Sequence, residues 1–450
     1  MSRNHRRGKT GVEPGLCHTP GVSDLVFRAN MLVAAVAAVI ARVLFVAAVP
    51  VDIEFGDAET YRLLGALLVE GEGYIRPREF LLQGERVPTA EFPPLWPMVL
   101  GVLDLLGFDG ISEQRAFGAI LGGATVVVVG LLGTALADRR VGVIAAFLAA
   151  AHPQLIVLDT SLLAEGLTVP LVAVALLGLA RARAAGGDVV GPDARRWWWL
   201  ASIAFGLAAL TRTEMVVLAV VLVVPGCRMD DRRAWARAAV MGLAGVLVCV
   251  GAWTARNLVT MGELQPFTNN SGTLLAGANC DAVYSGSQIG LWRFDCVTAV
   301  DTSGLDEAAA SHERRAAGIS HALDNPGDLP GVGVVRVLRT FGAWDVRTQL
   351  YFESFEGRDY RWLWAGWFGW IGVAAAAAGG AFLVDRSVWQ QRWLLVVPLG
   401  VVALTALASY GNQRFRASAE PGTLVLAAIG LVAMADRLRR QPAQAPTGSS

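Results

Sequence analysis

The sequence predicts an all-α polytopic membrane protein built around a bundle of about ten transmembrane helices. Its 450 residues are 54% hydrophobic and only 17% charged, a balance far from that of a soluble globular protein. The mean hydropathy is +0.47, and the charges gather between long apolar runs, as they do when helices cross a bilayer. The formal net charge is zero, so no nucleic-acid partner is expected.

The first predicted helix, 29–50, follows a basic arm over 1–28 that begins MSRNHRRGKT. The apolar run is about one full span long at 1.5 Å per residue. It is longer than the core of a signal peptide and has no convincing small-residue cleavage site. We therefore expect an uncleaved first helix with its N-terminus in the cytoplasm. Arg42 lies inside this run and is expected either to face the bundle interior or to snorkel.

Basic segments between the later apolar runs set the expected orientation, because Lys and Arg favour cytoplasmic loops. These segments are 138–140, 181–196, 227–237, 385–393 and 436–440. If all are cytoplasmic, the spans between them come in pairs and both chain ends are cytoplasmic. The segments 197–211 and 213–226 are short for a full span and could form a re-entrant pair. The ten predicted helices are 29–50, 115–137, 141–158, 161–180, 197–211, 213–226, 236–256, 365–384, 392–410 and 421–436.

One apolar stretch, FPPLWPMVLGVLDLLGF at 92–108, is left out of this count. It is borderline in length and contains three prolines and Asp104. Counting it as a span would invert the orientation of everything after it. We expect it to form a juxtamembrane helix at the outer face.

This topology leaves two large outer loops, 51–114 and 257–361. The predicted organisation is therefore a membrane module at 29–256 that includes the first loop, then the second loop, then C-terminal helices at 362–437. A disordered cytoplasmic tail is expected at 438–450. The second loop contains a soluble helix in DEAAASHERRAAGISHALDNPG, and the WLWAGWFGW after it is typical of an aromatic belt at the outer interface. Cys280 and Cys296 both fall in this loop. A disulfide between them is predicted because such bonds persist outside the cytoplasm; two unpaired thiols are the alternative.

The polar residues outside the basic segments come to the outer face under this topology. Any one of them could be an ordinary helix-boundary residue or an anchor to lipid headgroups. Several acids and several arginines at one membrane edge, where the orientation rule keeps Arg scarce, indicate a site instead. These residues are Asp57, Glu59, Arg115, Asp159, Glu165, Arg212, Glu214, Arg256, Asn257, Arg414, Arg416 and Glu420.

A base near water and a cationic cradle at the lipid boundary suit glycosyl transfer from a lipid phosphate. A carboxylate can accept the proton of an attacking sugar hydroxyl. Arginines can hold the phosphate leaving group and stabilise the charge that grows on it. One carboxylate is sufficient for so good a leaving group, and a single displacement inverts the anomeric carbon.

The order of motifs resembles the GT-C superfamily of polytopic glycosyltransferases, nearest to its protein-mannosyltransferase and aminoarabinose-transferase-like branch of the actinobacterial type. The motifs are GDAETY, EFPPLWPMVLG, SEQRAFGAILGG, RRVGVIAAFLAAAHP with SLLAE, LTRTE, WTARN and QRFRASAEP, and they extend from about residue 30 to 437. The resemblance implies a GT-C-like bundle in the plasma membrane, a polyprenyl-phosphate sugar donor and an active site facing the exterior.

The resemblance also implies roles for residues at matching positions. Asp57 inherits the role of catalytic base. The outer-face arginines are expected to bind the donor phosphate. The remaining acids are candidates for binding the substrate or a divalent metal ion, which some relatives use. Ala58 separates the two acids that are adjacent in the protein-modifying branch, and no large β-trefoil domain is present. The candidates are Arg414, Arg416, Arg115 and Arg256 for the phosphate, Glu59, Glu91 and Glu165 as acids, and Tyr61 and Arg212 in addition.

Two other classes compete with a transferase. A transporter or flippase of an anionic or lipid-linked substrate would also carry arginines near the membrane, but it usually shows internal repeats and broken helices at the midplane. A structural scaffold leaves the converging acids without a purpose. The sequence specifies neither the sugar nor the acceptor, which could be a glycan, a lipid or a protein.

Overall fold

The computed structural model describes residues 23–51, 56–185, 191–226, 232–383 and 389–440. This part of the chain is helical and contains no β-strand, only one isolated bridge between Ile75 and Pro88. The predicted all-α class is therefore confirmed. Most of the basic arm, Cys17, Cys227 and the end of the tail (441–450) lie outside the described residues.

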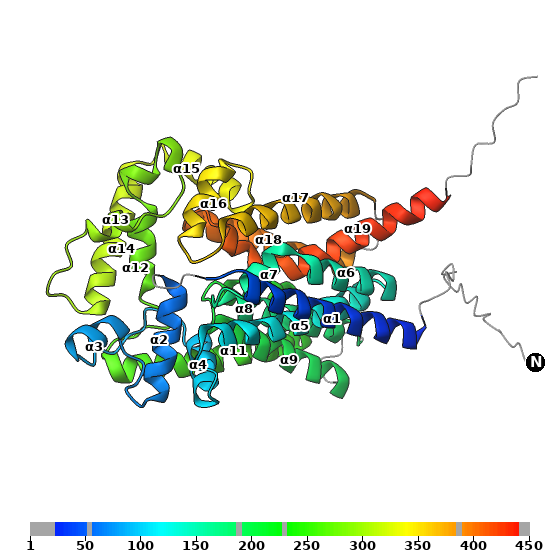
Figure 1. The fold of residues 1–450 in the computed structure, drawn as a ribbon, viewed down its shortest axis with the longest axis horizontal. Helices are drawn as coiled ribbons and strands as arrows, with labels where there is room; N and C mark the ends of the chain where they lie inside the picture. The colour runs from blue at the N-terminus through cyan, green and yellow to red at the C-terminus, as the bar shows by residue number, and fades with distance from the viewer. Residues whose placement is uncertain (1–22, 52–55, 186–190, 227–231, 384–388, 441–450) are drawn as a thin grey trace, which may run out of the picture.

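The long helices run side by side along the long axis of the molecule (Figure 1). Each of the ten predicted segments is helical in the structure, so the predicted elements are confirmed although several boundaries move. The helices of this bundle are α1 Asp24–Ala48, α5 Ile111–Leu136, α6 Arg139–Ala151, α7 Pro153–Asp159, α8 Glu165–Ala184, α9 Pro192–Ala209, α10 Met215–Gly226, α11 Arg232–Met261, α17 Tyr360–Leu383, α18 Trp389–Ala408 and α19 Glu420–Arg440.

Length and composition identify fewer membrane spans than ten. Within the described ranges, five helices are long and apolar enough to cross a membrane, and a sixth results if the bent pair α6 and α7 counts as one span. The α9 and α10 helices, the predicted short pair, have 18 and 12 residues. The chain is a multi-pass membrane protein whose shorter helices complete the bundle.

The predicted continuous span 141–158 is wrong in one respect, because the chain bends by 61° between α6 and α7. Proline lacks a backbone N–H and disfavours helical geometry in the residue before it. His152, which precedes Pro153, is accordingly extended, with φ −73° and ψ 112°. The bend carries α7 close to α5: a Cβ on Gly118 would lie 1.8 Å from the carbonyl oxygen of Asp159. Only glycine fits there.

The α7 helix also supplies the partner of Arg42. The Arg42 Nε donates to the Asp159 carboxylate at 2.6 Å, and both side chains are fully buried. Arg42 therefore faces the bundle interior and does not snorkel. Removing one member of such a pair leaves an uncompensated buried charge, which costs about 3–5 kcal/mol.

The first loop folds into α2 Asp57–Val69, α3 Pro77–Gln83 and α4 Leu95–Leu105. The α4 helix occupies the stretch predicted to stay out of the span count, and it runs across the direction of the long helices (Figure 1). It packs closely on α2 because Gly65 and Gly101 face each other: a Cβ on Gly101 would lie 2.6 Å from the Gly65 carbonyl oxygen. Eleven residues are too few to cross a bilayer.

The second loop folds into α12 Asn270–Ala278, α13 Phe294–Thr298, α14 Glu307–Asp324, α15 Leu329–Thr340 and α16 Val346–Ser354, with short 3₁₀ turns at Asp281–Val283 and Gly286–Gln288. The predicted soluble helix is α14. The predicted disulfide between Cys280 and Cys296 is formed, with 6.2 Å between the Cα atoms.

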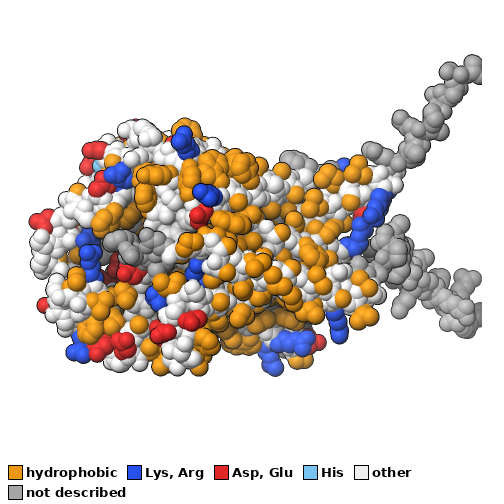
Figure 2. Space-filling model, in the orientation of Figure 1, with side chains coloured by type: hydrophobic (Ala, Val, Ile, Leu, Met, Phe, Trp, Pro, Cys, Tyr) orange, Lys and Arg blue, Asp and Glu red, His pale blue; other side chains and the backbone are white. Residues whose placement is uncertain are grey.

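The two loops form one cap on one end of the bundle, which we call the loop end. Glu307 of the second loop accepts hydrogen bonds from the Arg76 Nε at 3.0 Å and from the Ala90 N–H at 2.8 Å, both in the first loop. The start of α1 and the end of α19 lie at the opposite end (Figure 1). Figure 2 shows charged side chains gathered at both ends of this face, with a hydrophobic stretch between them. The first and the last described helix thus have their outer ends on the same side of the bundle, which agrees with an even number of crossings between them.

Candidate functional site

The guanidinium of Arg414 lies at the centre of a cluster of acids at the loop end. Its Nε and Nη2 donate to the two oxygens of Glu165 at 2.9 and 3.3 Å. Its Nη1 donates to Asp57 at 3.1 Å and to Glu356 at 3.0 Å. Three carboxylates that are far apart in the sequence thus converge on one arginine, which holds Glu165 in the bidentate geometry that guanidinium groups favour.

The chain presents each of these groups from an end of an element. Asp57 and Glu165 are the first residues of α2 and α8, where the partial positive charge of a helix N-terminus stabilises a carboxylate. Glu356 follows the end of α16. Arg414 lies in η4, a 3₁₀ turn at Gln413–Ala419 between α18 and α19, and its N–H is capped by the Asn412 side chain at 2.9 Å.

The turn that leads into α8 is strained at one residue. Leu162 has φ +59°, a left-handed conformation that branched side chains rarely adopt. The Trp96 indole N–H donates to the Leu162 carbonyl at 2.8 Å and helps to hold it. Strained backbone of this kind is concentrated at functional sites, and here it lies three residues before Glu165.

Two further arginines complete the cluster. Arg212 pairs with Glu165 and Glu214 and lies over the Phe415 ring, 5.4 Å from its centroid. Arg358 pairs with Glu353 at 3.2 Å and with Glu356 at 2.7 Å. The Asn412 amide also donates to Glu356, at 3.0 Å. Five carboxylates therefore share three guanidiniums, which leaves the cluster with an excess of acid.

Asp57 is the acid of this cluster best suited to take up a proton. Burial raises its pKa above the ordinary value, Arg414 opposes the rise, and the Glu356 carboxylate adds to it. Burial acts on Glu356 in the same direction, but Arg414 and Arg358 outweigh it and lower the pKa of Glu356. Asp57 also keeps 36% of its side chain exposed, whereas Glu165 is fully buried. A substrate can reach Asp57.

Tyr61, Glu59 and Glu91 flank Asp57. Tyr61 is buried one turn along α2, and burial and the Asp57 carboxylate raise its pKa. The Glu59 side chain forms no hydrogen bond or ion pair within the described residues. Burial and the neighbouring Glu307 raise the pKa of Glu91 to about 7. Tyr61 thus lies beside the cluster, and Glu91 belongs to the contact between the two loops.

The other arginines predicted to hold a phosphate contact the protein elsewhere. Arg416 donates to the Thr340 carbonyl at 3.0 Å and lies over the Trp370 ring at 4.3 Å. Arg115 donates to the carbonyls of Thr160 and Val49, both at 2.9 Å. Arg256 donates to the carbonyls of Thr89 and Tyr74, both at 2.7 Å. Among the described residues, no hydrogen bond or ion pair joins these three arginines to the acids around Arg414.

The acids do not form a recognisable metal site. Within the part of the chain that the structure describes, no group of three or more His, Cys, Asp or Glu side chains is arranged to hold a metal ion. The oxygens of Asp57, Glu165 and Glu356 are directed at the Arg414 guanidinium. We assign no step to a metal.

Known proteins resemble this chain in part of its sequence and in its fold. Residues 92–253 match the family model described as dolichyl-phosphate-mannose-protein mannosyltransferase; this range contains Glu165, Arg212 and Glu214. No curated protein matches the sequence.

Several solved structures match over most of the chain. The apo oligosaccharyltransferase of Archaeoglobus fulgidus is 15% identical over 92% of this chain and 51% of its own, with a TM-score of 0.53. The same enzyme tethered to an acceptor peptide with the NVT sequon is 15% identical over 93% of this chain and 50% of its own, with a TM-score of 0.52. ArnT from Cupriavidus metallidurans bound to undecaprenyl phosphate is 16% identical over 90% of this chain and 77% of its own, with a TM-score of 0.40. This chain spans about half the length of the oligosaccharyltransferase and shares its membrane fold.

Proposed function

We propose that this chain is a member of the GT-C superfamily of polytopic glycosyltransferases and transfers a sugar from a polyprenyl-phosphate donor to an acceptor at the loop end, with inversion. The family model over residues 92–253 and the shared membrane fold support this assignment. The observation that carries the proposal is the convergence of Asp57, Glu165 and Glu356 on Arg414. The description of the matched family, which names a dolichyl-phosphate-linked sugar, supports a lipid-phosphate donor. The apolar bundle that surrounds the site would bring such a lipid to it.

Asp57 acts as the general base in this reaction. It accepts the proton of the acceptor hydroxyl while that oxygen attacks the anomeric carbon. The bond between the anomeric carbon and the phosphate oxygen breaks, and its electron pair stays on the phosphate. The raised pKa of Asp57 suits this role, because a carboxylate with a higher pKa is a stronger base.

Arg414 links binding of the donor phosphate to the availability of the Asp57 carboxylate as a base. Its Nη1 is shared by Asp57 and Glu356, the two acids of the trio that keep some exposure, at 36% and 28%. A phosphate oxygen that takes this N–H replaces Asp57 as its acceptor and frees Asp57 for the acceptor hydroxyl. The same guanidinium then stabilises the charge that develops on the leaving phosphate. Glu165 holds it in place through Nε and Nη2.

The proposed location is the plasma membrane, with the loop end facing the exterior. Arginines gather at the ends of helices away from the loops, for example Arg437, Arg439 and Arg440 in the last turn of α19. Cytoplasmic segments carry such an excess of Lys and Arg. The acceptor then meets the donor outside the cell, where the disulfide between Cys280 and Cys296 is also stable.

The test uses the full chain in lipid nanodiscs with a panel of undecaprenyl-phosphate sugars and a mixture of glycan, lipid and peptide acceptors. We expect one donor to be consumed with release of undecaprenyl phosphate, and the product to have the opposite anomeric configuration by NMR. Retained configuration would overturn the single-displacement mechanism. Movement of the intact donor across a vesicle bilayer without any covalent transfer would identify a flippase instead.

A further inference from the structure

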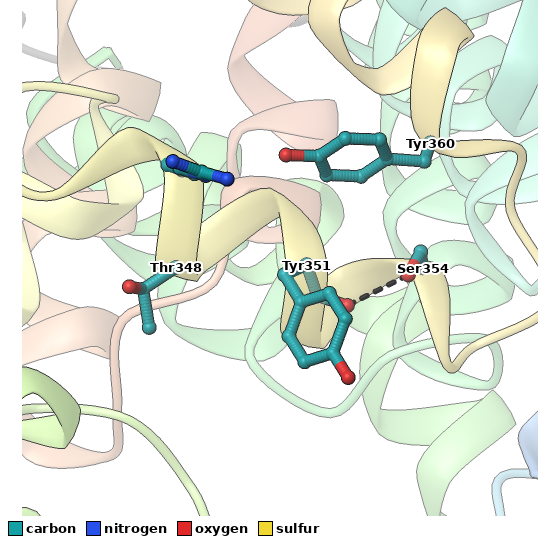
Figure 3. A pocket seen from close by; sticks show the side chains of 5 residues that line it. Thr348, Tyr351, Ser354 and Tyr360 are labelled. Carbon is teal, nitrogen blue, oxygen red and sulfur yellow. Dashed lines mark hydrogen bonds between the residues drawn. The ribbon is translucent and has the colours of Figure 1, made fainter.

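A pocket of about 590 Å³ lies at the loop end, where α16 meets the start of α17. Its lining residues are Arg347, Thr348, Tyr351, Ser354 and Tyr360. Figure 3 shows Thr348, Tyr351 and Ser354 along α16, with the Tyr360 ring on the other side. None of these residues takes part in the cluster around Arg414.

The pocket offers one cation and several hydroxyl groups. The Arg347 side chain is exposed and forms no hydrogen bond or ion pair within the described residues. The acids that flank the pocket residues in sequence are engaged elsewhere. Asp345 accepts from the Thr348 N–H at 3.4 Å, and Asp359 accepts from the Arg361 N–H at 2.9 Å. Glu353 and Glu356 pair with Arg358. The Ser354 hydroxyl already donates to the Tyr351 carbonyl at 2.7 Å, which leaves the hydroxyl groups of Thr348, Tyr351 and Tyr360 (Figure 3). A free guanidinium beside hydroxyl donors is the chemistry that recognises a phosphate oxygen.

The surroundings of the pocket are aromatic and exposed. Tyr351 is 55% exposed, Phe355 62% and Phe368 64%, and the rings of Tyr351 and Phe355 are in edge contact at 5.0 Å. Tyr360 begins α17, whose first turns carry Trp362 and Trp364. Tyr360 is 36% exposed, and Trp362 and Trp364 are half-buried. Tyr and Trp side chains with one apolar part and one polar end are enriched at the headgroup level of a bilayer. This setting favours an anion that carries an apolar tail over a soluble one.

We propose that this pocket binds the phosphate group of a membrane lipid. The Arg347 guanidinium and the hydroxyl groups hold the phosphate, while the exposed rings contact the start of the tail. Either a bulk phospholipid or a polyprenyl phosphate offers this chemistry. The site goes beyond the proposed reaction, because binding here requires no sugar transfer and no residue of the Arg414 cluster.

The buried side of α16 connects the pocket to the cluster. Glu353 is buried and accepts the Gln413 N–H at 2.7 Å. Gln349 is buried and donates to the Gly411 carbonyl at 3.1 Å. Both contacts fix α16 against the segment that carries Arg414. A lipid phosphate in the pocket would therefore contact the exposed side of the same helix whose buried side holds the segment with Arg414.

The test compares Arg347→Ala with Arg361→Ala, a matched control that removes an exposed arginine which does not line the pocket. Native mass spectrometry of each purified full chain measures the apparent Kd for dioleoylphosphatidylglycerol and for dioleoylglycerol, which has the same tails but no phosphate. Arg347→Ala should weaken binding of the phospholipid about tenfold, the loss expected for one charge-assisted contact. Arg361→Ala should leave this Kd within about twofold of wild type, and neither variant should change binding of the diglyceride.

Competition identifies the source of the phosphate. Displacement of the phospholipid by undecaprenyl phosphate, but not by undecaprenol, supports a site for the carrier, whereas failure of both to displace it supports a site for bulk phospholipid. Displacement by inorganic phosphate at equal concentration would overturn the lipid assignment. Equal losses in Arg347→Ala and Arg361→Ala, or equal affinity of wild type for the two dioleoyl lipids, would also overturn it. All readouts are binding constants, so they remain valid if the transferase proposal fails.

Discussion

Arg414 and Arg416 are two residues apart, yet they serve two different regions of the molecule. Arg414 donates to three carboxylates, and two of these keep 36% and 28% of their side chains exposed. Arg416 is fully buried; it meets a backbone carbonyl and the face of Trp370, with the Glu420 carboxylate at 4.0 Å. The His152 Nε2 lies 3.2 Å from the second oxygen of Glu420. A substrate can therefore reach the acids around Arg414, whereas the surroundings of Arg416 are buried.

The 3₁₀ geometry of η4 explains why the two side chains separate. A 3₁₀ turn has about three residues per turn, so positions i and i+2 are about two-thirds of a turn apart and point in different directions. The sequence RFR suggests a pair of equivalent cations. The structure teaches that neighbouring arginines can divide into one that organises a reactive cluster and one that locks helices together.

Arg414→Lys should have the largest effect on sugar transfer and should separate the roles of Arg414 and Arg416 most clearly. A single ammonium group cannot keep the contacts that the planar guanidinium makes with Glu165, Asp57 and Glu356. We expect the rate of sugar transfer to fall about 100- to 1,000-fold, as when an electrostatic donor at a reacting group is lost. Initial rates with limiting donor measure this. Arg416→Lys is the matched control and should stay within a few-fold of wild type; equal losses in both variants would contradict the division of roles.

Arg416→Met should affect stability far more than turnover. Within the described part of the chain, this change leaves the buried Glu420 carboxylate with only His152 as an ionisable neighbour. An uncompensated buried charge costs about 3–5 kcal/mol. Unfolding in detergent, followed by circular dichroism, should show this loss. The transfer rate per folded molecule should not change, and a specific loss of donor affinity would return Arg416 to the phosphate site.

Cys280→Ser should destabilise the cap without touching the cluster. The disulfide closes a loop with a sequence separation of 16, for which the chain-entropy account gives about 3 kcal/mol. Thiol labelling under denaturing, non-reducing conditions should modify neither Cys280 nor Cys296 in the wild type. Cys249→Ser, which removes a free thiol, is the control and should not lower the melting temperature comparably.

Glu91→Gln should produce the smallest effect, and one that depends on pH. Because the folded-state pKa of Glu91 is raised to about 7 from 4.5, the folded protein binds a proton that the unfolded chain lacks between these values. Its contribution to stability is present at pH 4.5 and is lost as the pH rises through 7. Glu91→Gln should therefore raise the melting temperature at pH 8 by roughly 2 to 4 °C and leave it unchanged at pH 4.5. A shift of equal size at both pH values would exclude this cause.

Much of the fold could be predicted from the sequence, because long apolar runs and the basic segments between them define the helices of a membrane protein. The α14 helix and the exclusion of α4 from the spans were both accessible in this way. The bend before Pro153 was not predicted, although proline is its direct signal. Asp57, Glu165, Arg212 and Arg414 were all candidates, since each lies at the end of an apolar run.

Glu356, Glu353 and Arg358 were missed. They lie in YFESFEGRDY, a polar stretch whose charges are indistinguishable from a solvated loop. Only the tertiary structure brings them to Arg414. The grouping of four charged residues directly before the aromatic start of α17 is the one sequence signal that could have drawn attention to them. The separation of Arg416 from Arg414 was equally inaccessible, because it depends on the local turn geometry.

The central claim is that Asp57 is the base of the cluster around Arg414, and the transfer rates of Asp57→Asn and Glu59→Gln test it most directly. Both changes replace an acid in the first turn of α2 by its amide, but only Asp57 contacts Arg414. With donor and acceptor at saturation in nanodiscs, Asp57→Asn should lower turnover about 100- to 10,000-fold, with donor binding retained. Glu59→Gln should turn over within a few-fold of wild type. Near-normal turnover in Asp57→Asn, or an equal loss in Glu59→Gln, would contradict the assignment.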